Sequence, residues 1–426
     1  MNAGIPARAA AQAILSDVLR RKRPFDAAVE YLEGLSPRDA GFARTIAAET
    51  LRRLGQIEAI ARHFVPKSPP PHKAGPTLEI LYAGICELLF LDVAPHAAVD
   101  AANRLASVDD KARHFKPLLN AVLRRVSSEG KALANAQDAL RLNTPDWLWE
   151  RWCESYGESR TRAIALAHAT QPPIDLTLKD SAFATQLDGR ILFDNVVRLR
   201  EPSRIEELPG FDEGLWWVQD AAASLPTSLM GEVSGQTVID LCAAPGGKTM
   251  QLAARGAKVV AVERDRSRLA RLKDNLARAK LSATLIEADM RDFTPSALGH
   301  FVLLDAPCSA TGTIRRHPDL PWNKNASDVN SCAQVAEELL DAAANMVAAG
   351  GLLVFAVCSL EPEEGEEQVA AFLRRRRDFR REPVTGRELF GRSEWLDRQG
   401  DLRTLPSHLA SEGGMDGFFA ARLRRL

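Results

Sequence analysis

The sequence predicts two kinds of domain in one chain of 426 residues, an all-α N-terminal domain followed by an α/β domain built on a doubly wound, mostly parallel sheet. Three observations predict this arrangement. Apolar residues up to about Lys131 recur only at helical spacing. Beyond residue 237, apolar strand-like runs alternate with helical segments. The first of these runs, at 238–241, leads through a pair of glycines into a helix.

The N-terminal part begins with apolar residues at helical spacing, among them Ala9, Ala13 and Val18. Further helices are expected at 38–54, 76–91, 97–106 and 117–126. A stiff, proline-rich loop is expected at 65–71. We take residues 1–135 as one compact domain that is long enough to fold alone. Its 19 Lys and Arg against 14 Asp and Glu give a net charge of +5, while the remainder carries −6, so a polyanion is a candidate partner for this end of the chain.

The middle of the chain is expected to form a small α+β subdomain at 143–230. A linker runs to Asn143, and the Thr-Pro pair at 144–145 is a typical helix start. Runs of β-type residues, such as 172–179, then predict short strands. The pattern alone does not indicate what this subdomain does. The remaining residues, 231–426, form the predicted α/β domain.

The motif at 238–249, VIDLCAAPGGKT, is typical of a nucleoside-cofactor site. Gly246 and Gly247 allow a tight turn, and a second strand ends in Glu263, whose carboxylate is placed to bind ribose hydroxyls. A P-loop would need glycine at Cys242, and the dinucleotide fingerprint G-x-G-x-x-G is absent. These differences favour an adenosine cofactor without a pyrophosphate, with S-adenosylmethionine as the candidate. The alternative is an ordinary turn whose glycines serve packing.

The rest of the α/β domain alternates regularly. Helices are expected at 266–280, 329–347 and 369–377, and strands at 284–289, 301–307, 352–359 and 417–423. The long helix is expected to stop at Gly350 and Gly351. Parallel strands end at one edge of their sheet, where ligands of such folds bind. The candidate groups at or just past strand ends are Gly246, Gly247, Glu263, Asp289, Asp305, Cys308 and Cys358.

Composition limits the class of protein. Hydrophobic residues make up 46% and charged residues 26%, as in a globular protein, and no apolar run reaches the length of a membrane span. The start of the chain has no signal-peptide core. Six cysteines are too sparse for a disulfide framework, so a reducing, cytoplasmic setting is expected. No C-x-x-C pair occurs, and we predict no metal site. The net charge of −1 argues against a surface covered in basic residues.

Two cysteines at strand ends indicate covalent chemistry. Cys308 and Cys358 lie 50 residues apart, on what should be adjacent strands. Carbon 5 of a pyrimidine is a poor nucleophile. When a thiolate adds to carbon 6, carbon 5 becomes nucleophilic enough to attack a sulfonium methyl group. The attacking group must be a thiolate, so nearby positive charge must lower the thiol pKa from its usual value of about 8.5. Lys248 and the Arg315–Arg316 pair are candidates for that charge. Asp305 could pair with the ring N3 and exocyclic amine. Inert packing is the alternative for any single cysteine.

Four motifs together resemble the RNA cytosine-C5 methyltransferases, and among them the bacterial RsmB type, which modifies small-subunit ribosomal RNA. They are DLCAAPGGKT at 240–249, DAPCSATGTIRRHPD at 305–319, CSLEPEE at 358–364 and DGFFAARL at 416–423. The domain at 1–135 is similar to the RNA-binding antitermination factor NusB. The resemblance covers nearly the whole chain. It implies a Rossmann-like methyltransferase domain with a seven-stranded sheet, S-adenosyl-L-methionine as cofactor and 16S ribosomal RNA as partner, with no DNA or membrane partner.

The resemblance also implies residue roles. Cys358 would be the nucleophile and Cys308 would assist product release. Glu263 would hold the ribose, Asp289 would lie near the adenine, and Asp305 would sit between cofactor and cytosine. The methionine part of the cofactor would be wrapped by Cys242, Ala243, Ala244, Pro245, Gly246, Gly247 and Lys248.

Three departures from the family pattern accompany this resemblance. Phe-Ala-Val precedes Cys358 where Tyr-Ala/Ser-Thr is usual, Glu263 stands where aspartate is common, and 143–230 is short.

DNA cytosine-C5 enzymes attack with a Pro-Cys thiol, which would favour Cys308 as the nucleophile. The RNA family favours Cys358, which is our choice. Rival functions are methylation of transfer RNA, RNA binding without catalysis, and methylation of adenine amino groups. The last needs an Asn/Asp-Pro-Pro-aromatic turn, and Cys308 argues against it.

Overall fold

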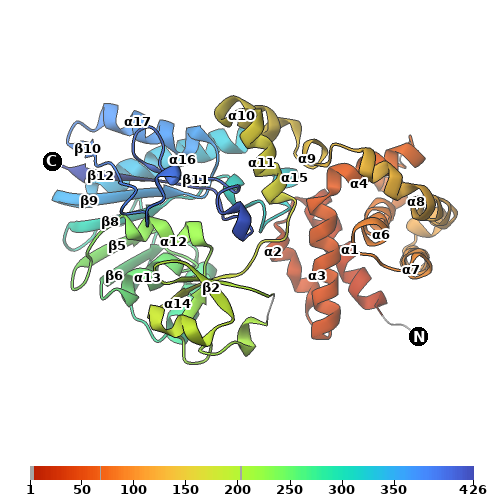
Figure 1. Ribbon diagram of the computed structural model, residues 1–426, viewed down its shortest axis with the longest axis horizontal. Coiled ribbons are helices and arrows are strands. Elements are labelled where there is room, and N and C mark those ends of the chain that lie inside the picture. Colours follow the sequence, from red (N-terminus) through yellow and green to blue (C-terminus); the bar gives the residue numbers. More distant parts are fainter. Residues whose placement is uncertain (1–3, 68, 202–203) are drawn as a thin grey trace. The chain divides into compact units, whose positions relative to one another are not determined.

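The computed structural model describes residues 4–67, 69–201 and 204–426. It divides into two compact units, one comprising Met1–Thr170 and Ile314–Asn325 and the other Gln171–Thr313 and Ala326–Leu426 (Figure 1). Three parts of the predicted domains lie outside the described residues, namely 1–3, Ser68 in the predicted proline-rich loop, and 202–203.

The first unit is helical and contains two hydrophobic cores. The longest of its helices, α8, continues well beyond the predicted end at 126, and the expected linker up to Asn143 is helical as well. The pattern at 38–54 covers α3 and the start of a second helix, α4, that the sequence did not separate. The helices are α1 Ile5–Arg21, α2 Phe25–Ala28, α3 Pro37–Arg52, α4 Leu54–Phe64, α5 Pro71–Ala74, α6 Thr77–Phe90, α7 Pro95–Val108, α8 Lys116–Ala136, α9 Ala139–Leu142, α10 Asp146–Tyr156, α11 Glu158–His168 and α15 Leu320–Asn323.

The helices α10 and α11 belong to this helical unit, although the sequence suggested a subdomain at 143–230. Only the part after Thr170 joins the second unit. The physical reason is that Leu148, Trp152 and Ile164 are fully or almost fully buried by helix packing and leave no apolar face for the strands that follow.

The segment Ile314–Asn325 also belongs to the helical unit, although it follows Cys308 in the sequence. The indole Nε1 of Trp322 donates to the carbonyl oxygen of Leu51 at 2.8 Å. The backbone N–H of Phe25 donates to Asp319 Oδ2 at 3.1 Å. Buried polar groups need hydrogen-bond partners. These two hydrogen bonds therefore hold the segment among the helices.

The second unit begins with a small antiparallel sheet in the order β2-β3-β1-β4. Its apolar side chains form a core of their own, with Trp216 fully buried. The ion pair between Arg198 and Asp175, 2.7 Å from Nε to Oδ1, is buried within the same sheet. The strands are β1 Asp175–Leu178, β2 Gly189–Phe193, β3 Val196–Leu199 and β4 Trp216–Val218.

The main sheet follows the order β10-β12-β9-β8-β5-β6-β7, and β11 pairs with the free length of β12. The described residues therefore give eight strands, one more than the predicted seven, because the short β11 adds a further antiparallel pairing. The five strands from β9 to β7 run parallel. The strands are β5 Thr237–Leu241, β6 Lys258–Glu263, β7 Thr284–Glu287, β8 Gly299–Asp305, β9 Val347–Val357, β10 Phe379–Arg381, β11 Leu402–Thr404 and β12 Phe418–Arg425.

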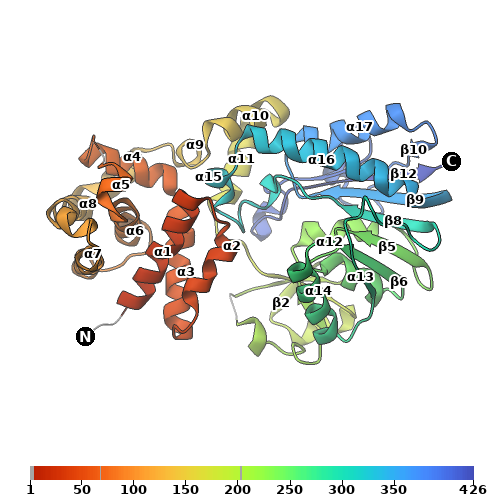
Figure 2. The ribbon, with the colours of Figure 1, turned by 180° about the vertical axis from the view of Figure 1, so that it is seen from behind.

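Helices cover both faces of this sheet, as the prediction of a doubly wound domain requires (Figures 1 and 2). One face packs against α12 Ala221–Ser228, α13 Gly247–Ala254 and α14 Arg266–Arg278. The other face packs against α16 Ala326–Asn345 and α17 Glu366–Arg375. Among the described residues, every helix is too short or too polar to span a lipid bilayer.

The prediction that Gly350 and Gly351 end the long helix is wrong. The helix α16 ends at Asn345, and β9 already begins at Val347. Within β9 the pairing shifts from Gly299↔Val347 to Phe301↔Leu352. Gly350 has a φ of +72°, so it supports an irregular stretch of strand rather than a helix end.

Candidate active site

The parallel strands bring the predicted groups to one edge of the sheet. Leu241 pairs with Val262 on one side and with Leu304 on the other, so these strands end at the same level. The chain runs from β5 outward to β7 and then crosses to β8 on the other side, which makes the β5–β8 junction the topological switch point. In order across the edge lie Cys358 after β9, Asp305 and Cys308 at β8, the motif from Cys242 to Lys248 after β5, Glu263 at β6 and Asp289 after β7.

The turn after β5 has the conformation that its glycines permit. Cys242 has a φ of +59° and Gly246 a φ of +107°. A Cβ on Gly246 would lie 2.2 Å from Leu272 Cδ1, so no larger residue fits there without movement. The N–H of Ala243 donates to the carbonyl of Val262 at 3.1 Å and ties the turn to β6. Burial raises the pKa of the Cys242 thiol to about 12, which leaves it a neutral packing group.

Glu263 is fixed by this turn. Its Oε2 accepts from Ala244 N at 3.3 Å and its Oε1 from Asp265 N at 3.0 Å, and it is 2% exposed. Each carboxylate oxygen retains a second lone pair that a ligand hydroxyl could use. Asp289 is half-buried and bound by Arg291 at 2.7 Å, and this hydrogen-bonded guanidinium lowers the pKa of Asp289 to about 2.

Lys248 and Asp305 form an ion pair across the switch point. Lys248 Nζ lies 2.7 Å from Asp305 Oδ2 and 5.0 Å from the ring centre of Phe418. The lysine is buried, whereas the aspartate side chain keeps 32% of its surface exposed. Asp305 is therefore the member of the pair that a ligand can reach.

Asp240, inside the motif, is a buried acid to which the sequence assigned no role. It is 1% exposed, and its Oδ2 accepts from Thr249 Oγ1 at 2.5 Å. Its Oδ1 has no hydrogen-bond partner among the described residues. Burial, with a further contribution from the charge of Asp305, raises the pKa of Asp240 from 3.8 to about 7.

Replacing Asp240 by asparagine should weaken the pH dependence of stability. Between pH 4 and 7 the folded protein holds a proton on Asp240 that the unfolded chain has released. Rising pH in this window therefore lowers the free energy of unfolding, by about 1.4 kcal/mol per unit for one such proton. Asp401, whose pKa burial also raises to about 7, contributes a slope of the same sign. The thermal midpoint of Asp240→Asn, followed from pH 4 to 8, should fall less steeply than that of the wild type, and parallel curves would contradict the assignment.

The two thiols meet at the end of β8 and β9. Cys308 Sγ and Cys358 Sγ are 3.5 Å apart, both cysteines are half-buried and free, and Gly312 N donates to the carbonyl of Cys358 at 3.1 Å. The adjacency of the two strands, predicted from the sequence, is confirmed. The hydrogen bond with Cys358, followed by burial, raises the pKa of Cys308 well above its usual value.

Of the positive charges expected to act on these thiols, the lysine is bound by a carboxylate and the two arginines belong to the helical unit. Lys248 is paired with Asp305. Arg315 is buried, and Arg316 follows it in the same unit. The arginines follow Cys308 closely in the sequence, but the chain enters the helical unit at Ile314, so they belong to a different compact unit from the thiols.

Three polar residues beside the thiols were missed. Ser309 and Ser359 each follow a cysteine, and both hydroxyls donate to the buried carboxylate of Glu364. The sequence contained a signal, because a Cys-Ser pair occurs at both strand ends.

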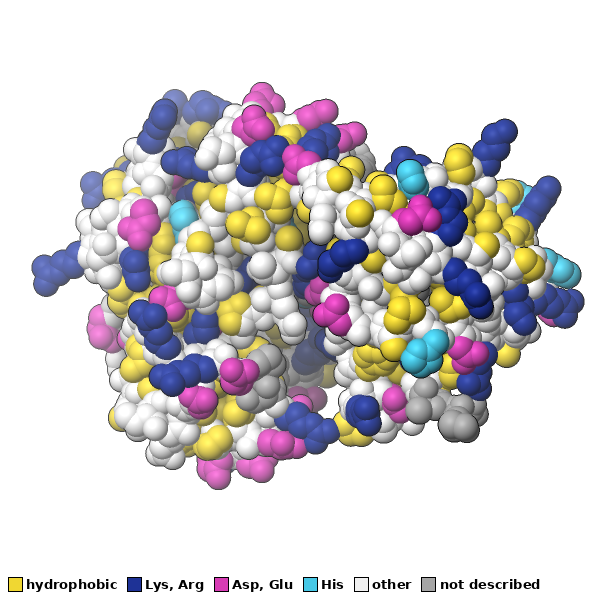
Figure 3. Space-filling model, turned by 45° about the vertical axis from the view of Figure 1, so that its right-hand side comes forward, with side chains coloured by type: hydrophobic (Ala, Val, Ile, Leu, Met, Phe, Trp, Pro, Cys, Tyr) yellow, Lys and Arg dark blue, Asp and Glu magenta, His cyan; other side chains and the backbone are white. Residues whose placement is uncertain are grey.

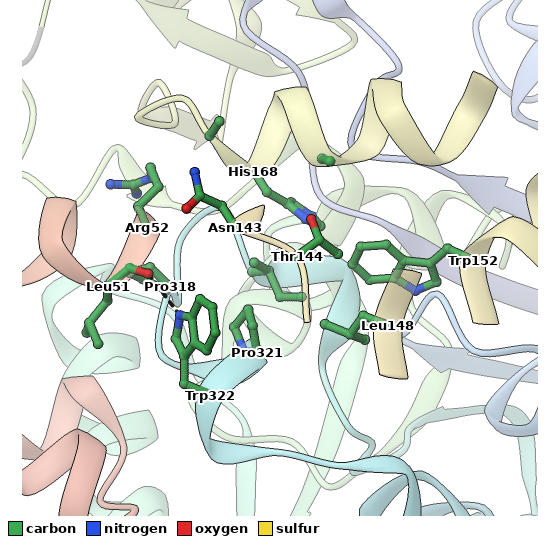
Figure 4. A pocket seen from close by; sticks show the side chains of 13 residues that line it. Leu51, Arg52, Asn143, Thr144, Leu148, Trp152, His168, Pro318, Pro321 and Trp322 are labelled. Atoms are coloured by element: carbon green, nitrogen blue, oxygen red, sulfur yellow. Dashed lines mark hydrogen bonds between the residues drawn. The ribbon is translucent and has the colours of Figure 1, made fainter. Parts of the chain in front are cut away.

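A separate small pocket lies within the helical unit (Figure 4). Trp152, His168, Arg52, Pro321 and Trp322 contribute to its wall, and no predicted cofactor or catalytic residue does. Burial, followed by the charges of Arg315 and Arg52, lowers the pKa of His168 to about 3, so its imidazole is neutral. Among the described residues no group of three or more His, Cys, Asp or Glu side chains is arranged to hold a metal ion.

The groups at the sheet edge fit S-adenosylmethionine better than a nucleotide phosphate. Glu263, Asp289 and Asp305 give the edge three carboxylates, which would repel a pyrophosphate. The same groups suit a ligand that carries ribose hydroxyls, an ammonium group and a sulfonium group. Asp240 adds the buried oxygen without a partner close to the turn.

Comparisons with known proteins show what the chain is similar to. A model of the 16S rRNA methyltransferase RsmB/F family matches residues 228–424, and a model of the NusB family matches residues 5–128. Ribosomal RNA small subunit methyltransferase B of Pseudomonas putida is 35% identical over 98% of both chains. The protein of that name from Cronobacter sakazakii is 35% identical over 91% of both chains. The crystal structure of PH0851 has the same fold, with a TM-score of 0.77 and 22% identity over 98% of each chain.

Proposed function

The chain belongs to the 16S rRNA methyltransferase RsmB/F family, and on that premise we propose that it methylates carbon 5 of a cytosine in small-subunit ribosomal RNA. It is an RNA methyltransferase whose cofactor is S-adenosyl-L-methionine. The names of its relatives support the ribosomal substrate. The observation that carries the cytosine chemistry is the contact of 3.5 Å between the Cys308 and Cys358 sulfurs beside the cofactor motif.

Cys358 acts as the nucleophile in this proposal. Its thiolate adds to carbon 6 of the cytosine, an S–C bond forms, and the electron pair that moves into the ring makes carbon 5 nucleophilic. S-adenosyl-L-methionine supplies the electrophilic methyl group. Two thiols in contact do not both ionise readily, because like charges repel at this distance. The hydrogen bond with Cys358, followed by burial, raises the pKa of Cys308, which suits the neutral role that the proposal gives to Cys308.

Cys308 assists release of the product. Once carbon 5 carries the methyl group, its proton leaves to a base, the S–C6 bond breaks and the Cys358 thiolate departs. The neutral thiol of Cys308, in contact with that sulfur, can donate a hydrogen bond to the departing thiolate. A side chain or a water molecule accepts the carbon-5 proton.

Asp305 binds the polar edge of the cytosine. Its exposed carboxylate lies on β8, next to Lys248, which keeps it oriented. A carboxyl group that hydrogen-bonds the ring N3 and the exocyclic amine assists attack on carbon 6, because negative charge develops in the ring during the addition. Cys242 to Lys248, Glu263 and Asp289 hold the methionine, ribose and adenine parts of the cofactor, respectively.

The NusB-type domain supplies RNA affinity in this proposal. The match over residues 5–128 and the net charge of +5 over 1–135 support this role. On the face that Figure 3 shows, Lys and Arg side chains are scattered over the helical unit, with acidic and hydrophobic side chains among them. A spread of this kind favours contact with several phosphates rather than one phosphate pocket. Action on ribosomal RNA implies a cytoplasmic location.

Methyl transfer from labelled S-adenosylmethionine tests the proposed function. Purified protein is incubated with 16S ribosomal RNA, with partly assembled small subunits and with transfer RNA, and the modified nucleoside is identified by mass spectrometry. We expect 5-methylcytidine in ribosomal RNA, and bisulfite sequencing of ribosomal RNA from cells without the gene should show one unprotected cytosine. Incorporation into transfer RNA alone, a methylated adenine, or binding without incorporation would each support a rival function.

A further inference from the structure

Glu364 joins the two loops that carry the cysteines. It lies in the turn Pro362–Glu364 and is 0% exposed. Its Oε1 accepts from the backbone N–H of Ser309 at 2.7 Å, and its Oε2 accepts from the Ser309 hydroxyl at 2.5 Å. The hydroxyl of Ser359 donates to the same Oε2. Because Ser309 follows Cys308 and Ser359 follows Cys358, one carboxylate is bound to the neighbour of each thiol.

The hydrogen bonds around Glu364 suit a carboxylate that accepts from both serines. Glu361 N donates to Ser359 Oγ at 3.0 Å, so the hydroxyl proton of Ser359 is available for Glu364. Both oxygens of Glu364 therefore face groups that can donate to them. Burial raises the pKa of Glu364, and the hydrogen bonds from Ser309 and Ser359 act in the opposite direction.

Further contacts hold the same two loops from the sides. Thr311 Oγ1 accepts from Leu360 N at 3.0 Å and lies 3.4 Å from Ser359 Oγ. Arg403, from β11, donates to the carbonyl of Ser359 at 2.5 Å and pairs with Glu366. Glu361, on the same loop as Glu364, and Arg403, on β11, therefore place a negative and a positive charge beside this network.

We propose that Glu364 is a positioning residue, which holds the loops after β8 and β9 so that the sulfurs of Cys308 and Cys358 stay in contact. The proposal rests on the proposed function, in which one sulfur attacks and the other assists its departure. Such a pair needs a fixed separation, because a displacement of about 1 Å can cost a reaction about 10²-fold. The carboxylate sets that separation without touching substrate.

Glu364→Gln tests the proposal. Glutamine keeps the volume but turns an NH2 group toward one of the donors, so the two loops should separate. We expect turnover to fall roughly 10- to 100-fold, with the KM for both substrates within about twofold of the wild type. The matched control is Glu367→Gln, since Glu367 is an exposed acid at the start of α17.

A second readout reports on the two sulfurs without requiring the reaction to occur. Phenylarsine oxide binds two neighbouring thiols through one arsenic atom and releases water. Its affinity, measured without RNA or S-adenosylmethionine, should fall at least about tenfold in Glu364→Gln and stay unchanged in Glu367→Gln. The thermal midpoint of Glu364→Gln is measured alongside the affinity. A lower affinity at an unchanged midpoint cannot be explained by a general loss of stability. If Glu364→Gln had the same turnover and the same arsenical affinity as the wild type, the proposal would be overturned.

A pair of smaller changes keeps the proposal testable if Glu364→Gln does not fold. Ser309→Ala together with Ser359→Ala removes the hydroxyl donors and leaves the carboxylate, and it should lower both turnover and arsenical affinity. No change in either quantity would overturn the positioning role. Failure of the proposed function would appear differently, as full activity in Cys358→Ala, while the arsenical affinities would still report on Glu364.

Discussion

Cys358→Ala should transfer no methyl group and should form no covalent complex with RNA that contains 5-fluorocytosine. Without the sulfur nothing adds to carbon 6, so carbon 5 stays a poor nucleophile. Fluorine in place of the carbon-5 proton blocks elimination, so an enzyme that attacks remains bound to the RNA. Methyl transfer is measured with labelled cofactor, and the complex is detected as a band of reduced mobility on a denaturing gel.

Cys308→Ala should behave differently from Cys358→Ala. If Cys308 assists departure of the sulfur, its loss should slow turnover but preserve the covalent complex, which should then accumulate even on unsubstituted RNA. Cys153→Ala, a half-buried cysteine of α10, is the control and should match the wild type. A covalent complex that survives in Cys358→Ala and disappears in Cys308→Ala would reverse the two roles.

Asp305→Asn should lower the rate of methyl transfer by roughly 10²- to 10⁴-fold, the range expected for loss of acid–base assistance. The side chain keeps its size, but it loses the negative charge that pairs with Lys248 at 2.7 Å and the capacity to share a proton with the ring. Covalent capture of 5-fluorocytosine RNA should slow by a similar factor, because the assistance acts on the addition step. The measurement is a single-turnover time course of capture.

Asp289→Asn is the matched control for Asp305→Asn. Asp289 lies beyond β7, two strands from β5, and is already held by Arg291. We expect the KM for S-adenosylmethionine to rise while the rate of covalent capture stays near that of the wild type. If the two variants lost capture equally, Asp305 would have no special role at the cytosine.

The sequence predicted which side chains meet at the edge of the sheet, because these residues lie at the ends of parallel strands. Parallel strands finish at one edge, so the apolar runs before Glu263, Asp305 and Cys358 were enough to predict that these groups converge. The positive φ at Gly246 and the order strand, turn, helix, strand likewise follow from local sequence. The contact between Cys308 and Cys358 follows from the pairing of β8 with β9.

Other features depend on contacts between distant residues. Glu364 meets Ser309 across 55 positions, and no local pattern marks such a hydrogen bond. Lys248 was expected to act on a thiol, but a carboxylate at the end of the neighbouring strand binds it more strongly. The sequence also did not predict that Ile314–Asn325 belongs to the helical unit. This placement depends on contacts with residues far away in the sequence, such as the hydrogen bond from Trp322 to the Leu51 carbonyl.

The most direct test of the central claim is to locate the covalent bond in the wild-type protein. The complex with 5-fluorocytosine RNA is digested with protease and nuclease, and the modified peptide is sequenced by mass spectrometry. We predict a methylated fluoropyrimidine nucleotide on the sulfur of Cys358, in the peptide that follows β9. The same modification on Cys308, or a complex with no bond to either sulfur, would contradict the account.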